Sequence, residues 1–365
     1  MKFSCDSILL AKAAVNIQRT VSSKSTIPAV EGILIECSND VLTLTGYDLD
    51  MGMKTQVECN TMEDGSLILN AKHFCDILRF LPSEEVLIED DDRHICKIKS
   101  GNAEYTIIGI DAGDYPDMPT VSNNEAIEIG NETLRDMIRK TVFSVSTSER
   151  NPVHCGIKFE IAGGKITLVA VDGARLAVRK EDISYAGGEK AFVVPTKAVN
   201  EILKLNEGED ENVKIYLSKR YISFIIGNYT IFSRLLEGNF IDYNAAIPKS
   251  AQTDIIVDTK VLISSIERTS LIITDRSSPV KCAAENSVMK FSCVTSVGTA
   301  NDRLAVEMTG KDIEIGFNNK FLLDALRAVD DEKVHIEMNS ASQPIIIKPT
   351  DGSDKYLFLV LPVRI

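Results

Sequence analysis

Short alternating apolar runs, interrupted by two longer helical patterns in each third of the chain, organise the sequence. The clearest run covers residues 167–178, T-L-V-A-V-D-G-A-R-L-A-V, where Asp172-Gly173 divides two apolar halves. Alternating and β-branched apolar residues are typical of strands, and glycine allows a tight turn because it adopts positive φ without a Cβ clash. This stretch therefore predicts a β-hairpin. Two uses remain open for the apolar side chains beside its turn, a packed core or a groove for another chain: Leu168, Val171, Leu176 and Val178.

Several landmarks recur three times at nearly constant spacing. Tyr105-Thr106-Ile107 returns as Tyr229-Thr230-Ile231 and, in looser form, as Tyr356-Leu357-Phe358. A lysine that opens a helical pattern, with an acidic residue at the fourth position after it, recurs as Lys72, Lys197 and Lys320. A repeat of fixed length indicates repeated structural units. We therefore predict three domains of like fold, residues 1–120, 121–249 and 250–365.

Each predicted domain has a short strand, a helix, a hairpin, a second helix and further strands, in that order. Stretches rich in proline, aspartate and serine at residues 116–122 and 248–250 are typical of linkers. The predicted fold class is therefore α+β, with two helices packed on antiparallel sheets in each domain. Apolar residues at spacings of three and four predict the helices: Asp6–Ser23, Ala71–Leu81, Asn131–Ser146, Thr196–Asn206, Asp258–Thr274 and Asn318–Val329.

The charge of the chain is unevenly distributed. The net charge is −13, which argues against a uniformly basic nucleic-acid binder. The predicted helices are nevertheless mildly basic, and Lys12 and Arg19 fall on one face of the first helix. The helices could therefore face a polyanion while the rest of the surface repels it, or their lysines could simply be solvated.

The cysteines and the apolar runs bear on the compartment. The eight cysteines form no C-x-x-C pair, so they are typical of reduced thiols in a cytoplasmic protein. No apolar run approaches the roughly 18 to 20 residues that a membrane span needs. We expect a cytoplasmic protein without a membrane anchor.

Sequence motifs of enzymes are missing. The chain has no dinucleotide-binding or phosphate-binding glycine motif, no metalloprotease motif and no nucleophile elbow. The four histidines are scattered, so neither a cofactor nor a metal is expected. Asp172 with Arg175 could form a catalytic pair, although a turn aspartate beside a cation is the simpler interpretation. Active sites assembled from distant residues leave no local signature, so an enzyme and a plain scaffold protein remain alternatives.

Six segments together carry a resemblance that covers the whole chain. The sequence resembles the bacterial DNA polymerase III β subunit family, the sliding clamps. The resemblance implies a non-catalytic processivity factor in which two protomers close head to tail into a ring, with helices around duplex DNA and sheets outside. The segments that carry it are Met1-Lys2-Phe3, residues 42–49 (L-T-L-T-G-Y-D-L), residues 171–178, residues 240–249 (F-I-D-Y-N-A-A-I-P-K), residues 314–318 (E-I-G-F-N) and residues 361–365 (L-P-V-R-I).

The resemblance also implies how DNA is held. A clamp must slide, so its helices need contacts to phosphates rather than to base edges. The implied partners are duplex DNA, the catalytic subunit of the replicative polymerase, the clamp loader, and other polymerases and repair proteins that carry clamp-binding peptides. The residues expected at or near the hole are Lys12, Arg19, Lys24, Lys72, Arg79, Arg135, Arg139, Lys197 and Lys204.

The family's partner-binding pocket lies between the second and third domains, and an apolar groove there suits a short extended peptide. Isoleucine stands at position 241, where proline is common, and small alanines stand at three positions where larger residues are often found. Ring closure is expected to use Tyr105 and Ile107 of one protomer with Ile272 and Ile273 of its partner. Carried over by position, the pocket comprises His154, Val171, Gly173, Ala174, Arg175, Leu176, Ile241, Ala245, Ala246, Asn318, Phe321, Ala341, Gln343, Val360, Leu361, Pro362, Val363 and Arg364.

Overall fold

The computed structural model describes residues 1–121, 125–205, 211–274 and 279–364. Ser122 of the expected first linker, Asn206 at the expected end of the fourth helix and Ile365 of the tail lie outside these residues. The chain forms two compact units, one of residues 1–132 with 197–235 and one of residues 133–196 with 236–365.

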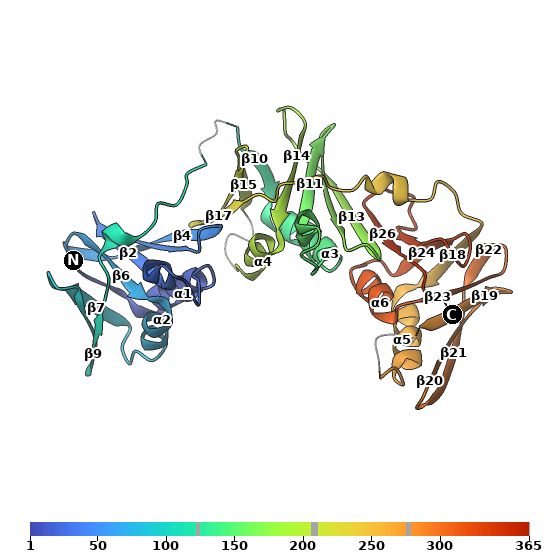
Figure 1. Cartoon of the computed structure of the whole chain (residues 1–365), viewed down its shortest axis with the longest axis horizontal. Helices are drawn as coiled ribbons and strands as arrows, with labels where there is room; N and C mark the ends of the chain where they lie inside the picture. The colour runs from blue at the N-terminus through green and yellow to red at the C-terminus, as the bar shows by residue number, and fades with distance from the viewer. Residues whose placement is uncertain (122–124, 206–210, 275–278, 365) are drawn as a thin grey trace. The chain divides into compact units, whose positions relative to one another are not determined.

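The first unit contains two antiparallel sheets and two helices that pack together, α1 (Ser7–Gln18) and α2 (Ala71–Arg79) (Figure 1). Helix α4 (Thr196–Lys204) begins at the boundary between the units. The five-stranded sheet has the order β5 (Asn60–Glu63), β1 (Lys2–Asp6), β7 (Glu85–Asp90), β8 (Ile95–Ser100), β9 (Ala103–Ile108). The eight-stranded sheet has the order β10 (Ile127–Gly130), β15 (Asn212–Leu217), β16 (Tyr221–Ile226), β17 (Tyr229–Arg234), β4 (Met51–Glu58), β3 (Val41–Tyr47), β2 (Gly32–Ser38), β6 (Gly65–Asn70).

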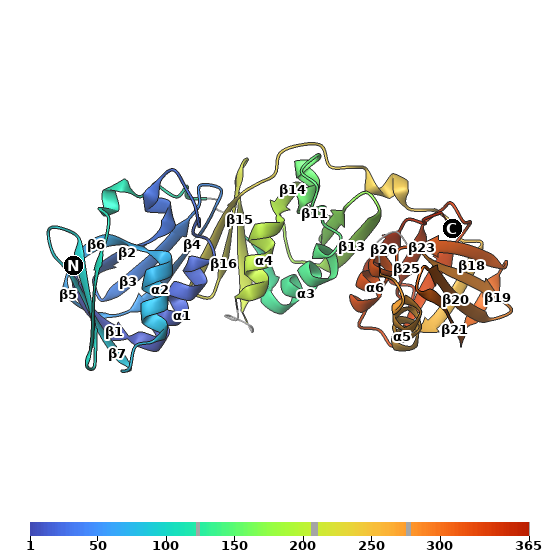
Figure 2. The ribbon, with the colours of Figure 1, turned by 60° about the horizontal axis from the view of Figure 1, so that its bottom comes forward.

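The second unit contains helix α3 (Asn131–Val142), which starts at the boundary, and two helices that lie side by side, α5 (Thr259–Ser270) and α6 (Asn319–Arg327) (Figure 2). Its nine-stranded sheet has the order β14 (Lys190–Pro195), β11 (Gly156–Ala162), β12 (Lys165–Val171), β13 (Arg175–Asp182), β26 (Tyr356–Val360), β25 (Ile345–Lys348), β24 (Lys333–Met338), β18 (Thr253–Asp258), β22 (Glu307–Gly310). Its four-stranded sheet has the order β21 (Gly298–Ala305), β20 (Val288–Thr295), β19 (Val280–Glu285), β23 (Ile313–Phe317).

All six predicted helices are present, but several are shorter than expected. The residues predicted to open three of them, Asp6, Asp258 and Asn318, are instead their N-caps. The Asp6 carboxylate accepts hydrogen bonds from the backbone N–H groups of Ile8 and Leu9, which have no partner inside the helix. These caps fix the helix starts one residue later than the apolar spacing alone predicts.

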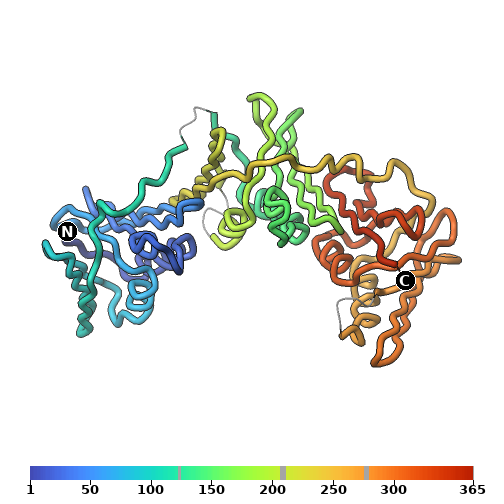
Figure 3. Tube along the Cα trace, in the orientation of Figure 1, coloured from blue at the N-terminus to red at the C-terminus, as the bar shows by residue number. Residues whose placement is uncertain are grey.

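The nine-stranded sheet has two faces with different coverings. Because side chains alternate along a strand, Ala177 and Phe358 join the core that α5 and α6 cover, while Leu176 and Leu359 belong to a second cluster on the opposite face. Tyr243, from the one-turn helix η4 (Tyr243–Ala246), packs on that second cluster. Figure 3 follows the extended segment that leads into η4. We call the two surfaces the helix face and the linker face.

Two hydrogen-bonded ladders join strands that come from different repeats. Strand β17 pairs with β4 in the first unit, and β26 pairs with β13 in the second. Strands predicted for the central domain therefore extend the sheets of both neighbours. The two compact units divide the central repeat between them, so they do not test the domain boundaries predicted near residues 120 and 249. These boundaries stay predictions. None of the described helices is long and apolar enough to cross a lipid bilayer.

Candidate functional site

The predicted hairpin is present, and its turn is held by one carboxylate. Val171 at the end of β12 pairs with Leu176 of β13. The Asp172 carboxylate accepts hydrogen bonds from the backbone N–H groups of Ala174 and Arg175 at 3.0 and 3.1 Å. Gly173 has a φ of +88°, a conformation that strains a residue with a Cβ atom. Asp172 is therefore a structural turn residue.

Arg175 is fixed between two carboxylates and two aromatic rings. Its guanidinium donates to Asp172 and to Asp324 of α6, at 2.7 Å in each case. It also lies over the ring of Phe321, 4.4 Å from the centroid, and 5.7 Å from the centroid of Phe143. Its side chain is 11% exposed and extends toward α6, on the helix face. The Arg175 side chain therefore turns away from Leu176, because neighbouring strand residues point to opposite faces, and its place in the partner pocket stays a prediction.

The linker is anchored on the linker face by polar contacts. The Tyr243 hydroxyl donates to the Glu160 carboxylate on β11 at 2.5 Å. Burial, and secondly the Glu160 carboxylate, raise the pKa of Tyr243 above its ordinary value, so the phenol keeps the proton that it donates. Next to it, the Phe240 ring meets the His154 ring edge to face, with centroids 5.3 Å apart. Lys158 lies near the rings of both Phe240 and Tyr243.

The C-terminal tail runs between the hairpin and the four-stranded sheet. Leu361 donates its backbone N–H to the carbonyl of Ala174 at 2.8 Å, and Val363 donates to that of Gly316 at 2.9 Å. Proline at position 362 has no N–H to leave unpaired between these two bonds. The tail is thus held by its backbone while its side chains stay accessible.

Three large apolar side chains remain exposed where the tail and the linker were predicted to form a pocket. Ile241 is 46% exposed, Leu361 is 40% exposed and Val363 is 38% exposed. Leu361 lies two residues after Leu359, and Ile241 lies two residues before Tyr243, both of which belong to the buried cluster on the linker face. In that cluster, Leu176 and Leu359 pair directly across β13 and β26. Exposed apolar side chains on segments that border a buried apolar cluster are typical of a site for a protein or peptide.

Several predicted pocket residues do not lie on this face. Val360 is 1% exposed and belongs to the core on the helix face, and its place in the pocket stays a prediction. Leu359 occupies the corresponding place on the linker face and was missed, although the period of two along β26 could have identified it. Asn318 caps α6, and Phe321 lies under Arg175. The remaining predicted positions are exposed: Ala245 and Ala246 on η4, Ala341 and Gln343 between β24 and β25, and Arg364 in the tail.

The residues predicted to contact DNA lie on helices or beside them in both units, and several have acidic partners. Arg19 and Lys204 contact Glu201 at 2.7 and 2.8 Å, Arg79 contacts Asp76, and Lys197 contacts Asp48. Lys12, Lys24 and Lys72 are exposed in the first unit, and Lys72 lines a cavity at the start of α2 of about 400 Å³. Arg135 and Arg139 lie on α3 in the second unit.

The residues predicted for ring closure lie at sheet edges or near them. Tyr105 and Ile107 are half-buried on β9, the last strand of its sheet. Ile272 and Ile273 follow α5 and pack partly against the core of the second unit. Their neighbours Ile108 and Leu271, which were not predicted for this interface, are 80% and 81% exposed.

All eight cysteines are free thiols, and six are buried. Burial raises the pKa of Cys5 to about 12 and that of Cys37 to about 11, since a thiolate is poorly solvated there. These two thiols are therefore protonated and weakly nucleophilic at neutral pH.

Three family models match successive parts of the chain: the DNA polymerase III beta subunit N-terminal domain over residues 1–119, its central domain over residues 128–242 and its C-terminal domain over residues 244–364. The chain is 33% identical to the beta sliding clamp of Halalkalibacterium halodurans, and the match covers 100% of both chains. The crystal structure of the DNA polymerase sliding clamp from Bacillus subtilis superposes with a TM-score of 0.97 at 31% identity, covering 100% of this chain and 99% of that one. A putative DNA polymerase III beta subunit from Eubacterium rectale superposes with a TM-score of 0.96 at 32% identity, covering 100% of both chains.

Proposed function

Because the chain belongs to the DNA polymerase III beta subunit family, the bacterial β sliding clamps, we propose that two copies close head to tail into a ring around duplex DNA. Clamps of this family are non-catalytic processivity factors that work with DNA and DNA polymerase. In that role, this chain's own residues close the ring, contact DNA and bind partner proteins.

Ring closure is supported by the two junctions inside the chain. At each junction, the strand that carries the Tyr-x-(Ile/Phe) landmark pairs with the strand that follows the hairpin turn of the preceding repeat, β17 with β4 and β26 with β13. The remaining strands of these two kinds are β9 and β21. Among the described residues, β9 and β21 are each an edge strand of their sheet. An unpaired edge is a template for another strand, so β9 of one copy fits β21 of the other. Tyr105 and Ile107 belong to this edge.

Contact with DNA is assigned to the helices. Lys12, Lys24 and Lys72 offer exposed ammonium groups on or next to α1 and α2, and the acidic partners of Arg19, Lys197 and Lys204 moderate their charge. Scattered cations neutralise phosphates without reading bases, and a moderate attraction permits sliding. Retention then depends on closure of the ring rather than on affinity.

The partner site is assigned to the linker face, where the exposed Ile241, Leu361 and Val363 lie on the segments that border the buried cluster of Leu176 and Leu359. An extended peptide with apolar anchors is the ligand that such a surface suits. We assign to it the replicative polymerase, the clamp loader, and other polymerases and repair proteins with clamp-binding peptides. Since all eight cysteines are free thiols, we place the protein in the cytoplasm.

The observation that carries this assignment is the tail, whose backbone is fixed at both ends while its apolar side chains are exposed. A Leu361→Asp substitution places a charge on the exposed tail and leaves the backbone bonds intact. We expect polymerase binding to weaken about 30-fold, since loss of an apolar anchor costs about 2 kcal/mol or more. Removing residues 361–365 should abolish binding while the dimer persists.

Surface plasmon resonance with the replicative polymerase subunit measures the affinity, and size-exclusion chromatography follows the dimer. Met62→Asp is the matched control, because Met62 on β5 is also an exposed apolar residue, 52% exposed, but lies in the first unit. Unchanged polymerase affinity in Leu361→Asp, with the control also unchanged, would remove the tail from the partner site.

A further inference from the structure

A polar cluster lies on the linker face, on strands β18 and β24. Asp254 and Glu337 stand directly opposite each other in the antiparallel pair. His335 lies two residues before Glu337 and therefore on the same face. Like charges opposed across two strands are unfavourable, so this pair of carboxylates needs a positive group between or beside them.

The three side chains converge on one point. His335 Nε2 lies 2.8 Å from Asp254 Oδ1. One ligand atom from each of Asp254, His335 and Glu337 lies within 4.8 Å of the other two. The side chains are partly buried, with exposed fractions of 41%, 20% and 18% for Asp254, His335 and Glu337. Zinc holds nitrogen and carboxylate ligands at about 2.0 to 2.2 Å, so the spacing of the three atoms is close to what a single ion requires.

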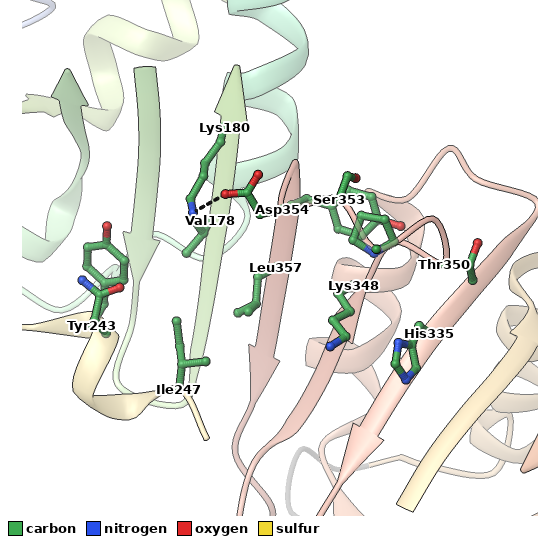
Figure 4. A pocket seen from close by; sticks show the side chains of 14 residues that line it. Val178, Lys180, Tyr243, Ile247, His335, Lys348, Thr350, Ser353, Asp354 and Leu357 are labelled. Carbon is green, nitrogen blue, oxygen red and sulfur yellow. Dashed lines mark hydrogen bonds and ion pairs between the residues drawn. The ribbon is translucent and has the colours of Figure 1, made fainter. Parts of the chain in front are cut away.

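The cluster borders an open cavity. The cavity has a volume of about 430 Å³ and is lined by His335, Lys348, Leu357, Tyr243 and Ile247 among others. Figure 4 shows His335 and Lys348 close together on neighbouring strands. The cavity shares no lining residue with the predicted partner pocket. Water or a ligand atom can therefore reach a cation held by the three side chains.

We propose that Asp254, His335 and Glu337 form a binding site for a divalent transition-metal ion of the zinc class. One imidazole and two carboxylates suit zinc, and three protein ligands leave one position open toward the cavity. The Lys348 ammonium, which contacts Glu337, occupies the place of the cation when no metal is bound. Its flexible stem lets it withdraw into the cavity when the metal enters. Bound metal ties β18 to β24 across the linker face.

Isothermal titration of the chelator-treated full-length protein with zinc chloride tests the site. We expect one equivalent of zinc bound per chain, with affinity at least about tenfold weaker in His335→Gln and in Asp254→Asn. Lys348→Met should bind zinc more tightly, because the substitution removes a competing cation and leaves the three ligand residues unchanged. His94→Gln is the matched control, since His94 faces Asp111 at 3.9 Å but belongs to no three-ligand group among the described residues.

Cobalt(II) in place of zinc gives a spectroscopic readout that separates this site from the free cysteines. We expect d–d absorption bands without the intense charge-transfer band of a cobalt–thiolate bond, and the bands should be lost in His335→Gln. Circular dichroism checks that each variant is folded. Equal zinc affinity in the wild-type protein and His335→Gln, or a cobalt spectrum dominated by thiolate, overturns the proposal.

Discussion

Arg175 shows how one side chain holds the hairpin turn beside the proposed partner site. Its guanidinium meets Asp172 in the hairpin turn and Asp324 on α6, and it stacks on Phe321. The planar, permanently charged group satisfies both carboxylates at once, which a lysine cannot do in the same geometry. The turn that positions Leu176 is therefore tied to the third repeat by Arg175 from the opposite face.

Removing this side chain should destabilise the second unit. Arg175→Ala leaves two carboxylates, 15% and 23% exposed, without their cation, and breaking a buried ion pair costs about 3 to 5 kcal/mol. Urea unfolding followed by circular dichroism measures the change. Arg79→Ala is the control, because Arg79 and Asp76 form the same i,i+3 pair with both side chains 47% exposed, and such a pair contributes at most about 1 kcal/mol. Equal shifts in the two variants would contradict the role given to Arg175.

The geometry of strands decides which side chains of the hairpin and the tail share a face. The positions of the hairpin, the tail and the linker followed from the sequence, but the predicted pocket residues form consecutive runs. A strand sends alternate side chains to opposite faces, so Arg175 and Val360 turn toward the helix face while Leu359 joins Leu176. Which face is covered by helices depends on packing, and no local pattern reveals it.

At the scale of elements, the two junctions use the same register. In the first, Tyr229 on β17 stands opposite Thr55 on β4, and in the second, Tyr356 on β26 stands opposite Arg179 on β13. Thr55 and Arg179 occupy equivalent positions after their turns, which contain Asp48 and Asp172. The equivalent position in β21 is Asp302, which pairs with Phe291 of β20 as Thr55 pairs with Leu44 of β3 and Arg179 with Leu168 of β12. On the proposed ring closure, the repeated register therefore places Tyr105 of one protomer opposite Asp302 of its partner.

This register predicts a specific cross-link. Thr106 and Asn301 come directly opposite each other between protomers, at the short separation that a disulfide bond accepts. Oxidised glutathione should convert the Thr106→Cys, Asn301→Cys double variant into a covalent dimer on non-reducing gels. Thr106→Cys with Arg303→Cys, two residues out of register, is the control and should stay largely uncross-linked. Cross-linking of the control in preference to the first pair would show that the register of the junctions does not extend to ring closure.

Most elements could be predicted from the sequence because each has a local cause. Polar caps such as Asp6 and Asn70 begin helices, and Asp172-Gly173 makes a turn. The pairing of strands from different repeats has no such local cause, since it joins residues far apart in the chain. The same limit hid the cluster of Asp254 and His335, because histidines scattered in the sequence meet carboxylates only when β18 and β24 pair.

For the whole molecule, the distribution of charge influences DNA binding more than the net charge does. A net charge of −13 opposes DNA at long range, whereas exposed lysines on α1, α2 and near them attract phosphates over about one Debye length, roughly 8 Å at physiological salt. Such a protein binds free DNA weakly. Durable association must then come from closure of the ring around the duplex, which makes the topology of the DNA decisive.

The most direct test loads the protein onto nicked circular DNA with its ATP-driven clamp loader and then cuts the circle at one site. Gel filtration in moderate salt separates protein that stays on DNA from free protein. An encircling clamp remains with the intact circle and leaves after linearisation, because it slides off the new ends. Retention that is the same on circular and linear DNA would contradict encirclement, whatever the affinity of the helices for phosphate.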